Sequence, residues 1–114
     1  MKEIYNFLKD YPIEGLIFNC NDKVDRIYHC INCFQQKSVP FNIIMVRGKI
    51  FVVPRNPRHE IVKEFPFGVL ASVEIAGRLI LTDEENFRET TYKTVKSAFK
   101  KSGLKRAEIV RLIK

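Results

Sequence analysis

The sequence has no tryptophan, two histidines and three cysteines, and it lacks any long apolar run. A membrane-spanning helix needs about 18 consecutive apolar residues, and residues 1–5 lack the apolar segment of a secretory signal. An odd number of cysteines is also a poor disulfide framework. These absences predict a cytoplasmic protein with reduced thiols and no membrane partner.

What the chain does contain is typical of a single globular domain. Of its 114 residues, 46% are hydrophobic and 29% are charged, a composition far from the low hydrophobicity of disordered chains. This length suffices to bury one core but not two independent ones. We therefore expect one domain spanning residues 1–114.

Positive charge is concentrated near the end of the chain. The formal net charge is +7, and residues 100–114 carry six basic side chains against one acidic residue, Glu108. Such an excess favours a phosphate or nucleic-acid partner, with a solvated helix face as the plain alternative. A second basic group, Arg47, Lys49, Arg55 and Arg58, lies where a turn is expected to bring its members together.

The first part of the chain predicts a strand and then a helix. Residues 12–19 form a short apolar run opened by a proline, which is typical of a strand. Apolar side chains then recur at spacings of three and four, which predicts an amphipathic helix that Asn21 or Asp22 can cap. The apolar positions are Val24, Ile27, Tyr28, Ile31 and Phe34. Since Pro40 disfavours helical geometry at the residue before it, the helix should end near Lys37.

Residues 41–46 and 49–54 are β-rich and are separated only by Arg47 and Gly48, which predicts a β-hairpin. A type I′ turn would require a positive φ at Arg47, so the turn type stays open. After a proline-punctuated segment, residues 69–75 and 78–81 predict two more strands or one bent strand.

The last third of the chain predicts two helices. Thr82 and Glu85 have the spacing of a capping box, so a helix should begin there, and Gly103 can end it in left-handed geometry. Its apolar positions are Phe87, Thr91, Val95, Ala98 and Phe99. A shorter helix over residues 104–114 should turn Ile109, Leu112 and Ile113 inward. The whole pattern predicts an α+β fold, a mostly antiparallel sheet with helices packed on one face.

Three segments carry a resemblance to a known family. They are Pro40 to Ile44, Ile50 to Arg55 and Val73 to Leu81. In their order and spacing they resemble the C-terminal part of the GDP-sugar phosphorylases, which act on GDP-L-galactose or GDP-D-glucose and are nucleotidyltransferases of the histidine-triad superfamily. The resemblance spans roughly residues 12–113. It implies half of a histidine-triad-type fold in a protein that handles GDP or a GDP-sugar.

The chemistry of that family requires a histidine that attacks the α-phosphorus of GDP-hexose and is then displaced by phosphate. The family holds this nucleophile in a His-x-His-x-His or His-x-His-x-Gln strand, where its neighbours orient the ring. His29 and His59 are the only histidines, and neither lies in such a pattern. We therefore predict no catalytic residue and no cofactor, and a non-catalytic domain that is a fragment, a partner half or a degenerate relative of the enzyme.

The candidate nucleotide or phosphate contacts are Asn42, Arg47, Lys49, Arg55 and Arg78. A guanidinium at Arg55 can pair bidentately with a phosphate, and a surface salt bridge is the alternative. Asn42 can bind a nucleotide or neighbouring backbone groups. Arg47 and Lys49 flank the hairpin turn, where they add positive potential or simply face water, and Arg78 lies in the second sheet segment.

Cys30 and Cys33 form a C-x-x-C pair beside His29, which raises the question of a zinc site. On a helix, however, His29 and Cys30 point about 100° apart, and a second ligand pair is absent. We therefore predict no metal site, core or half-buried thiols, and a half-buried imidazole at His29. His59 is expected in an exposed loop.

Three functions remain open from the sequence. The first is GDP or GDP-sugar binding in a half-site that a catalytic partner chain completes. The second is a basic nucleic-acid-binding module built on the C-terminal helices, although no motif of the common nucleic-acid folds supports it. The third is an assembly role, in which a sheet edge or helix face forms a homodimer.

Overall fold

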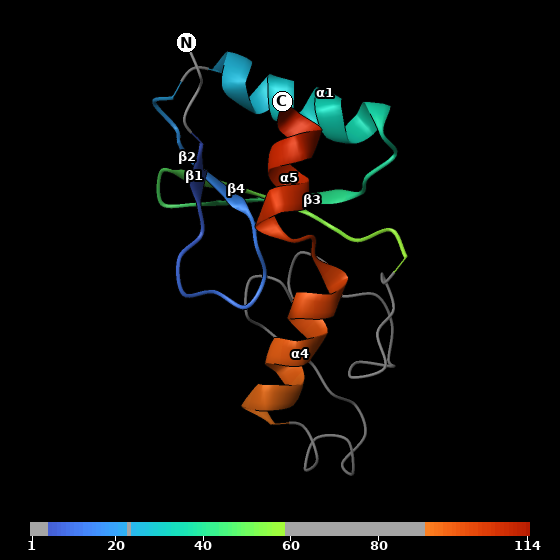
Figure 1. Ribbon diagram of the computed structural model, residues 1–114. Coiled ribbons are helices and arrows are strands. Elements are labelled where there is room, and N and C mark those ends of the chain that lie inside the picture. Colours follow the sequence, from blue (N-terminus) through green and yellow to red (C-terminus); the bar gives the residue numbers. More distant parts are fainter. Residues whose placement is uncertain (1–4, 23, 59–90) are drawn as a thin grey trace.

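A computed structural model describes residues 5–22, 24–58 and 91–114. Within these ranges the elements follow one another as β1 (Asn6–Phe7), β2 (Leu16–Asn19), α1 (Val24–Gln36), β3 (Phe41–Val46), β4 (Lys49–Pro54), α4 (Tyr92–Ser102) and α5 (Arg106–Ile113) (Figure 1). The α+β class is confirmed. The strands predicted at 69–75 and 78–81 and the capping box at Thr82 lie outside the described residues.

The strands form one antiparallel sheet in the order β1-β2-β4-β3. The predicted hairpin is confirmed, with β3 and β4 paired from Phe41 opposite Pro54 to Val46 opposite Lys49. Arg47 and Gly48 have φ angles of 48° and 77°, so both central residues adopt the positive φ of a type I′ turn. Strand β1 was not predicted, because two residues are too few to show an alternating pattern.

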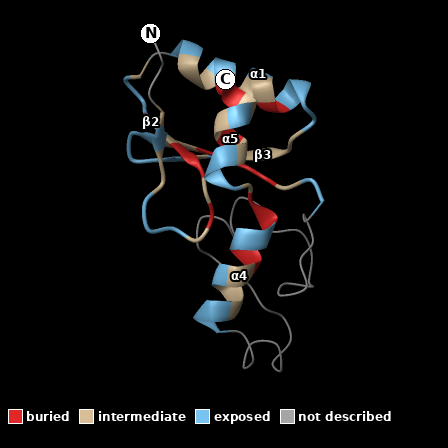
Figure 2. Cartoon of the chain, viewed as in Figure 1, coloured by how far each residue is buried: buried red, intermediate tan, exposed pale blue. Residues whose placement is uncertain are grey.

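Helices α1 and α5 cover one face of the sheet. Figure 1 shows α5 lying across the strands with α1 beside it, and Figure 2 shows buried positions where these helices meet the sheet. The cluster between them contains Leu16, Phe18, Cys30, Phe34, Val52, Ile109 and Ile113. The imidazole Nε2 of His29 lies 2.7 Å from the carbonyl oxygen of Ile113, which ties α1 to the end of α5.

The buried side of α1 differs from the predicted one. Val24 and Tyr28, expected to point inward, are 60% and 62% exposed, whereas Cys30 is fully buried. The reason is that α5 packs on the side of the helix that presents Cys30 and Phe34, and a thiol behaves there as a small apolar group. The end of α1 at Gln36 agrees with the prediction.

Helix α4 begins later than the sequence suggested. Thr91 was expected inside a helix that starts at Thr82, but its backbone is extended and it caps the helix instead. The Thr91 hydroxyl accepts the backbone N–H of Thr94 at 3.2 Å, which satisfies one of the free donors at the helix start. A continuous helix through Thr91 is therefore wrong, and residues 82–90 lie outside the described part of the chain.

Gly103 ends α4, as predicted, but not in left-handed geometry. Its φ is −101°, a value open to any residue. A side chain at this position would collide with Ile13, because an added Cβ would lie 2.5 Å from Ile13 Cγ1. Ile13 forms a second core cluster with Val53 and with Ala98 and Phe99 of α4. Glycine is thus required for close approach, not for backbone freedom.

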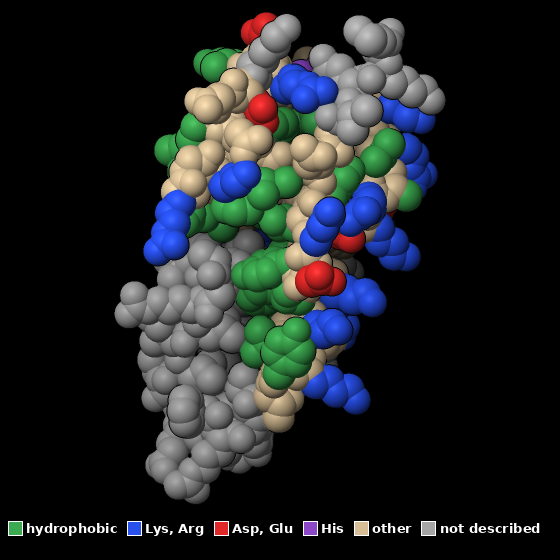
Figure 3. Space-filling model, turned by 90° about the vertical axis from the view of Figure 1, so that its left-hand side faces the viewer, with side chains coloured by type: hydrophobic (Ala, Val, Ile, Leu, Met, Phe, Trp, Pro, Cys, Tyr) green, Lys and Arg blue, Asp and Glu red, His purple; other side chains and the backbone are tan. Residues whose placement is uncertain are grey.

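Charged and apolar groups occupy different parts of the surface. Figure 3 shows lysine and arginine side chains in a column along one side of the molecule, with an apolar patch near the middle of the view. None of the helices in residues 24–36, 92–102 and 106–113 has the length and apolar character that a membrane span requires.

Candidate functional site

Four of the five candidate residues belong to the β3–β4 hairpin region. Successive side chains on a strand point to opposite faces, and the register pairs Asn42 with Val53 and Ile44 with Phe51. Asn42 therefore shares a face with Val53 and with Arg55, two positions further along. At the other end of the same face Lys49 precedes Phe51, and Arg47 occupies the turn. This face is opposite to the one that α1 and α5 cover.

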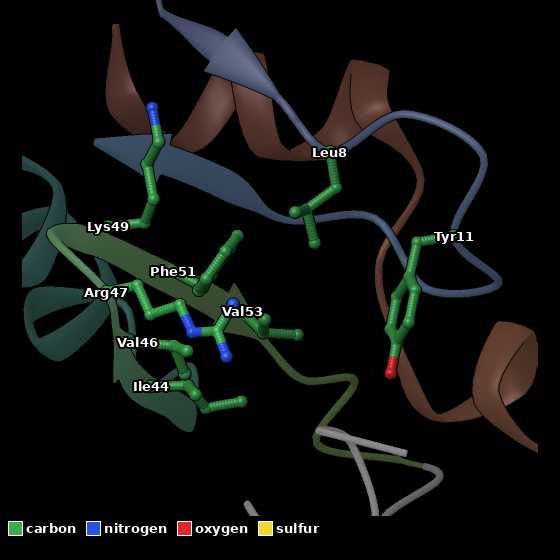
Figure 4. A pocket seen from close by; sticks show the side chains of 8 residues that line it. All are labelled: Leu8, Tyr11, Ile44, Val46, Arg47, Lys49, Phe51 and Val53. Atoms are coloured by element: carbon green, nitrogen blue, oxygen red, sulfur yellow. The ribbon is translucent and has the colours of Figure 1, made fainter. Parts of the chain in front are cut away.

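A pocket of about 420 Å³ lies on this second face. Strands β3 and β4 form its floor, and the segment between β1 and β2 forms one wall (Figure 4). Its lining residues are Leu8, Tyr11, Ile44, Val46, Arg47, Lys49, Phe51 and Val53. Most of the described lining is apolar, and its polar groups are two cationic side chains and one phenol, a composition that suits a small-molecule pocket.

The two basic residues of the pocket are oriented differently. In Figure 4 the Arg47 side chain extends across the apolar floor toward Val53. Lys49 points its ammonium group away from the other lining side chains, and this group donates a hydrogen bond to the amide oxygen of Asn19. Arg47 is therefore the cation that faces a molecule in the pocket, and Lys49 stands at its rim.

Tyr11 closes the other end of the pocket. Its ring is tilted against Phe99 of α4, with the ring centres 6.2 Å apart. Burial raises the pKa of the Tyr11 hydroxyl above its ordinary value of 10.0, because the phenolate form loses solvation there. At neutral pH the group is thus a neutral phenol, able to donate a hydrogen bond.

Arg55 is buried, with only 4% of its surface exposed. Its Nε–H donates to the carbonyl of Ser102 at 3.1 Å, and Nη1 donates to Oδ1 of Asn42 at 2.9 Å. The backbone of Arg55 also forms a β-bridge with Gly103. Arg55 thus joins the hairpin to the end of α4, and its side chain is buried and not at the surface.

The expected gathering of basic side chains by a turn is also wrong. Arg47 sits in the hairpin turn, whereas Arg55 follows the far end of β4. Six residues of extended strand separate Lys49 from Arg55, which is about 20 Å at ~3.4 Å per residue. One phosphate cannot contact both ends. Asn42 and Arg55 form one group, and Arg47 and Lys49 another.

The prediction of a half-buried imidazole at His29 is wrong, because His29 is exposed. The prediction of core or half-buried thiols is confirmed for Cys30, which is buried, and for Cys33, which is half-buried, whereas Cys20 is exposed. His29 is hydrogen-bonded to the Ile113 carbonyl, and the Sγ atom of Cys33 lies 3.6 Å from its Nε2. Within residues 5–22, 24–58 and 91–114, no group of three or more His, Cys, Asp or Glu side chains converges as metal ligands do. The three cysteines are free thiols. Arg78 and His59 lie outside the described residues.

Sequence reasoning missed the apolar part of the pocket. Phe51 and Ile44 are not among the candidate contacts, although strand alternation places both on the face of Asn42. Leu8 and Tyr11 belong to a segment without a regular pattern, and no sequence signal pointed to them.

Comparison with protein-family models identifies a family that matches nearly the whole chain. Residues 2–112 match the model of a family described as GDPGP1-like, C-terminal domain. No curated protein and no solved structure matches the chain significantly.

Proposed function

The chain belongs to the family of GDPGP1-like C-terminal domains, and we propose that it provides a non-catalytic nucleotide-binding half-site to a GDP-hexose phosphorylase. The family match extends over residues 2–112 and so includes the whole β3–β4 hairpin. Three thiols, an odd number, suit a reducing compartment, so we place this function in the cytoplasm.

The observation that carries the proposal is the position of Arg47 across an apolar floor. A nucleoside diphosphate needs apolar surface for its base and cations for its phosphates. Phe51 and Ile44 supply the first, and Arg47 and Lys49 supply the second at the hairpin end. A pocket volume of about 420 Å³ lies within the usual range for small-molecule sites, roughly 300–1,000 Å³.

The histidines are the reason why we assign binding but no catalysis to this domain. Transfer of a guanylyl group through the enzyme needs a histidine nucleophile that neighbouring groups orient. The His29 ring is instead engaged with the Ile113 carbonyl at 2.7 Å, on the side of the sheet that α1 and α5 cover. In this proposal the domain binds and orients GDP, and a histidine from the catalytic part of the enzyme attacks the α-phosphorus.

Calorimetric titration with GDP tests the half-site. We expect saturable binding with one GDP per chain, weakened at least tenfold in Arg47→Ala/Lys49→Ala, because the cation that faces the pocket, Arg47, and the one at its rim, Lys49, are both lost. Lys93→Ala/Lys96→Ala removes the same charge from the exposed side of α4, where neither lysine is among the described lining residues, and should leave the affinity unchanged. Absence of binding, or an equal loss in both double variants, would contradict the proposal.

A second assay separates binding from catalysis. Purified protein mixed with GDP-hexose and phosphate should release no GDP, since neither histidine of the sequence lies in a His-x-His pattern and the His29 ring is engaged with the Ile113 carbonyl. If GDP is released, and the release disappears in His29→Ala, the domain is an enzyme on its own and the non-catalytic assignment is wrong.

A further inference from the structure

Helices α4 and α5 carry a basic surface that the pocket does not use. Residues 91–114 contain eight Lys and Arg side chains and one acidic residue, Glu108, an excess equal to the whole net charge of +7. Lys93, Lys96 and Lys100 are exposed and follow one another at spacings of three and four residues. They therefore lie on one side of α4, and we call them the lysine stripe.

The lysine stripe points away from the core. The opposite side of α4 presents Ala98 and Phe99, which are 3% and 2% exposed and pack against Ile13 and Val53. Within residues 5–22, 24–58 and 91–114, no carboxylate forms a salt bridge with the stripe, and the only acid of α5 caps its own helix. The three lysines of the stripe are thus exposed on the side of α4 that faces away from the core.

An exposed aromatic ring stands beside the stripe. Tyr92 is 75% exposed and lies one helical turn before Lys96, so the two side chains share one side of the helix. A large aromatic side chain that contributes nothing to the core, next to cations, is the arrangement with which proteins stack single-stranded bases and hold the backbone between them.

The basic surface continues onto α5 and ends in a hollow. Arg111 of α5, Lys37 at the end of α1 and Arg58 after β4 line a depression of about 470 Å³. Glu108 also faces it, which leaves an excess of two positive charges. These three cations come from separate segments of the chain, so the fold itself brings them together.

We propose that α4 and α5 form a binding surface for single-stranded nucleic acid. The lysine stripe and the cations of the hollow contact phosphates, and one base stacks on Tyr92. A membrane surface fits less well, because an interfacial helix inserts its apolar side into lipid and that side of α4 is buried in the core. An acidic peptide would leave the exposed ring of Tyr92 without a role.

Fluorescence anisotropy with a labelled single-stranded RNA of mixed sequence, about 15 nucleotides long, tests this surface on the full chain. Each phosphate contact to a single strand contributes a slope of about −0.7 to the plot of log K against log salt concentration. Lys93→Gln/Lys96→Gln/Lys100→Gln should therefore make the slope shallower by about 2. Tyr92→Ala should lower the affinity about tenfold through lost stacking and leave the salt slope unchanged.

A matched pair of double variants distinguishes RNA binding at the lysine stripe from a general effect of net charge and from binding in the pocket. Lys93→Gln/Lys96→Gln and Arg47→Gln/Lys49→Gln remove the same charge from two different places. Only the first should weaken RNA binding, and only the second should weaken GDP binding. Equal losses of RNA affinity in both variants, or displacement of the RNA by polyglutamate or anionic vesicles as readily as by unlabelled RNA, would overturn the proposal.

Discussion

Gly103→Ala tests whether the end of α4 packs against Ile13 as the structure shows. The new methyl carbon would lie 2.5 Å from Ile13 Cγ1 and 3.0 Å from its Cδ1. Carbon atoms in contact are optimally about 3.5–4.0 Å apart, so one of the two residues has to move. Ile13 is only 2% exposed and is packed against Val53, Ala98 and Phe99, which leaves it little room.

The change in the free energy of unfolding on Gly103→Ala is the sum of two effects of opposite sign. Overpacking of a core usually costs about 1–3 kcal/mol. Replacement of glycine by alanine at a conformation that alanine accepts recovers about 0.4–1 kcal/mol, because the unfolded chain loses freedom. Gly103 has a φ of −101° and meets this condition. We therefore expect a net loss of about 1–2 kcal/mol in the free energy of unfolding.

Urea unfolding followed by circular dichroism, in a double-mutant cycle with Ile13→Ala, measures this effect. Without the two Ile13 carbon atoms, Gly103→Ala should be neutral or slightly stabilising, so the two substitutions should couple by at least 1 kcal/mol. Gly48→Ala is the control. Nothing lies within 4 Å of a Cβ at Gly48, but its φ is +77°, so its cost should be the same with or without Ile13→Ala.

The result that refutes this reasoning is a loss on Gly103→Ala that persists unchanged in the Ile13→Ala background. Ile13 would then not be the obstacle. A Gly103→Ala variant as stable as the parent protein would show that the loop before β2 can shift without lowering the free energy of unfolding.

Three further predictions concern single groups. Arg55→Ala removes the donors to Asn42 and Ser102 and should lower the free energy of unfolding by about 3–6 kcal/mol, measured with urea, since the two hydrogen bonds from this charged donor contribute about 1.5–3 kcal/mol each. Arg55→Lys should recover little, because a single ammonium cannot reach both acceptors. Thr91→Ala removes the N-cap of α4 and should cost about 1 kcal/mol, with Thr91→Asn close to the parent in a thermal melt. Because burial raises the pKa of Tyr11, its proton is held more tightly in the folded state. Stability should therefore fall as the pH rises above the ordinary value of 10.0, and Tyr11→Phe should flatten this dependence in urea unfolding at pH 9 and 11.

The elements that local pattern determines were predicted well. The two β-rich runs around Arg47 and Gly48 gave the hairpin with both boundaries correct, because alternation and a two-residue turn are local signals. Pro40 placed the end of α1 within one residue of its observed end at Gln36. The inward positions Ile109 and Ile113 of α5 were also correct.

Features that depend on distant contacts could not be predicted in the same way. The buried side of α1 is decided by α5, which packs on Cys30 and Phe34. Gly103 is required by Ile13, a residue far away in the sequence. Arg55 could be recognised as a special arginine, but its acceptor, the carbonyl of Ser102, lies 47 positions further along the chain. Periodicity and propensity contain no information about such partners.

For the pocket, sequence reasoning identified the cations and missed the floor. Arg47 and Lys49 attracted attention because they are charged and flank a turn, and they do line the pocket. Phe51 and Tyr11 also line the pocket, yet aromatic residues in a sequence look alike whether they face a core or a ligand. The register of the hairpin places Phe51 on the pocket face, whereas Tyr11 lies in a segment without a regular pattern.

Two long-range hydrogen bonds have a consequence for synthesis of the chain on the ribosome. One joins α5 to α1, and the other joins Ser102 to Arg55. The Ile113 carbonyl meets His29 across 84 positions, and Ser102 meets Arg55 across 47. At about 5–20 residues per second, the ribosome needs roughly 3–12 s to pass from Arg55 to Ile113. During that interval Leu16 and Val52 have no helix α5 to cover them. The apolar face of β2 and β4 that α5 covers therefore stays uncovered until α5 has been synthesised.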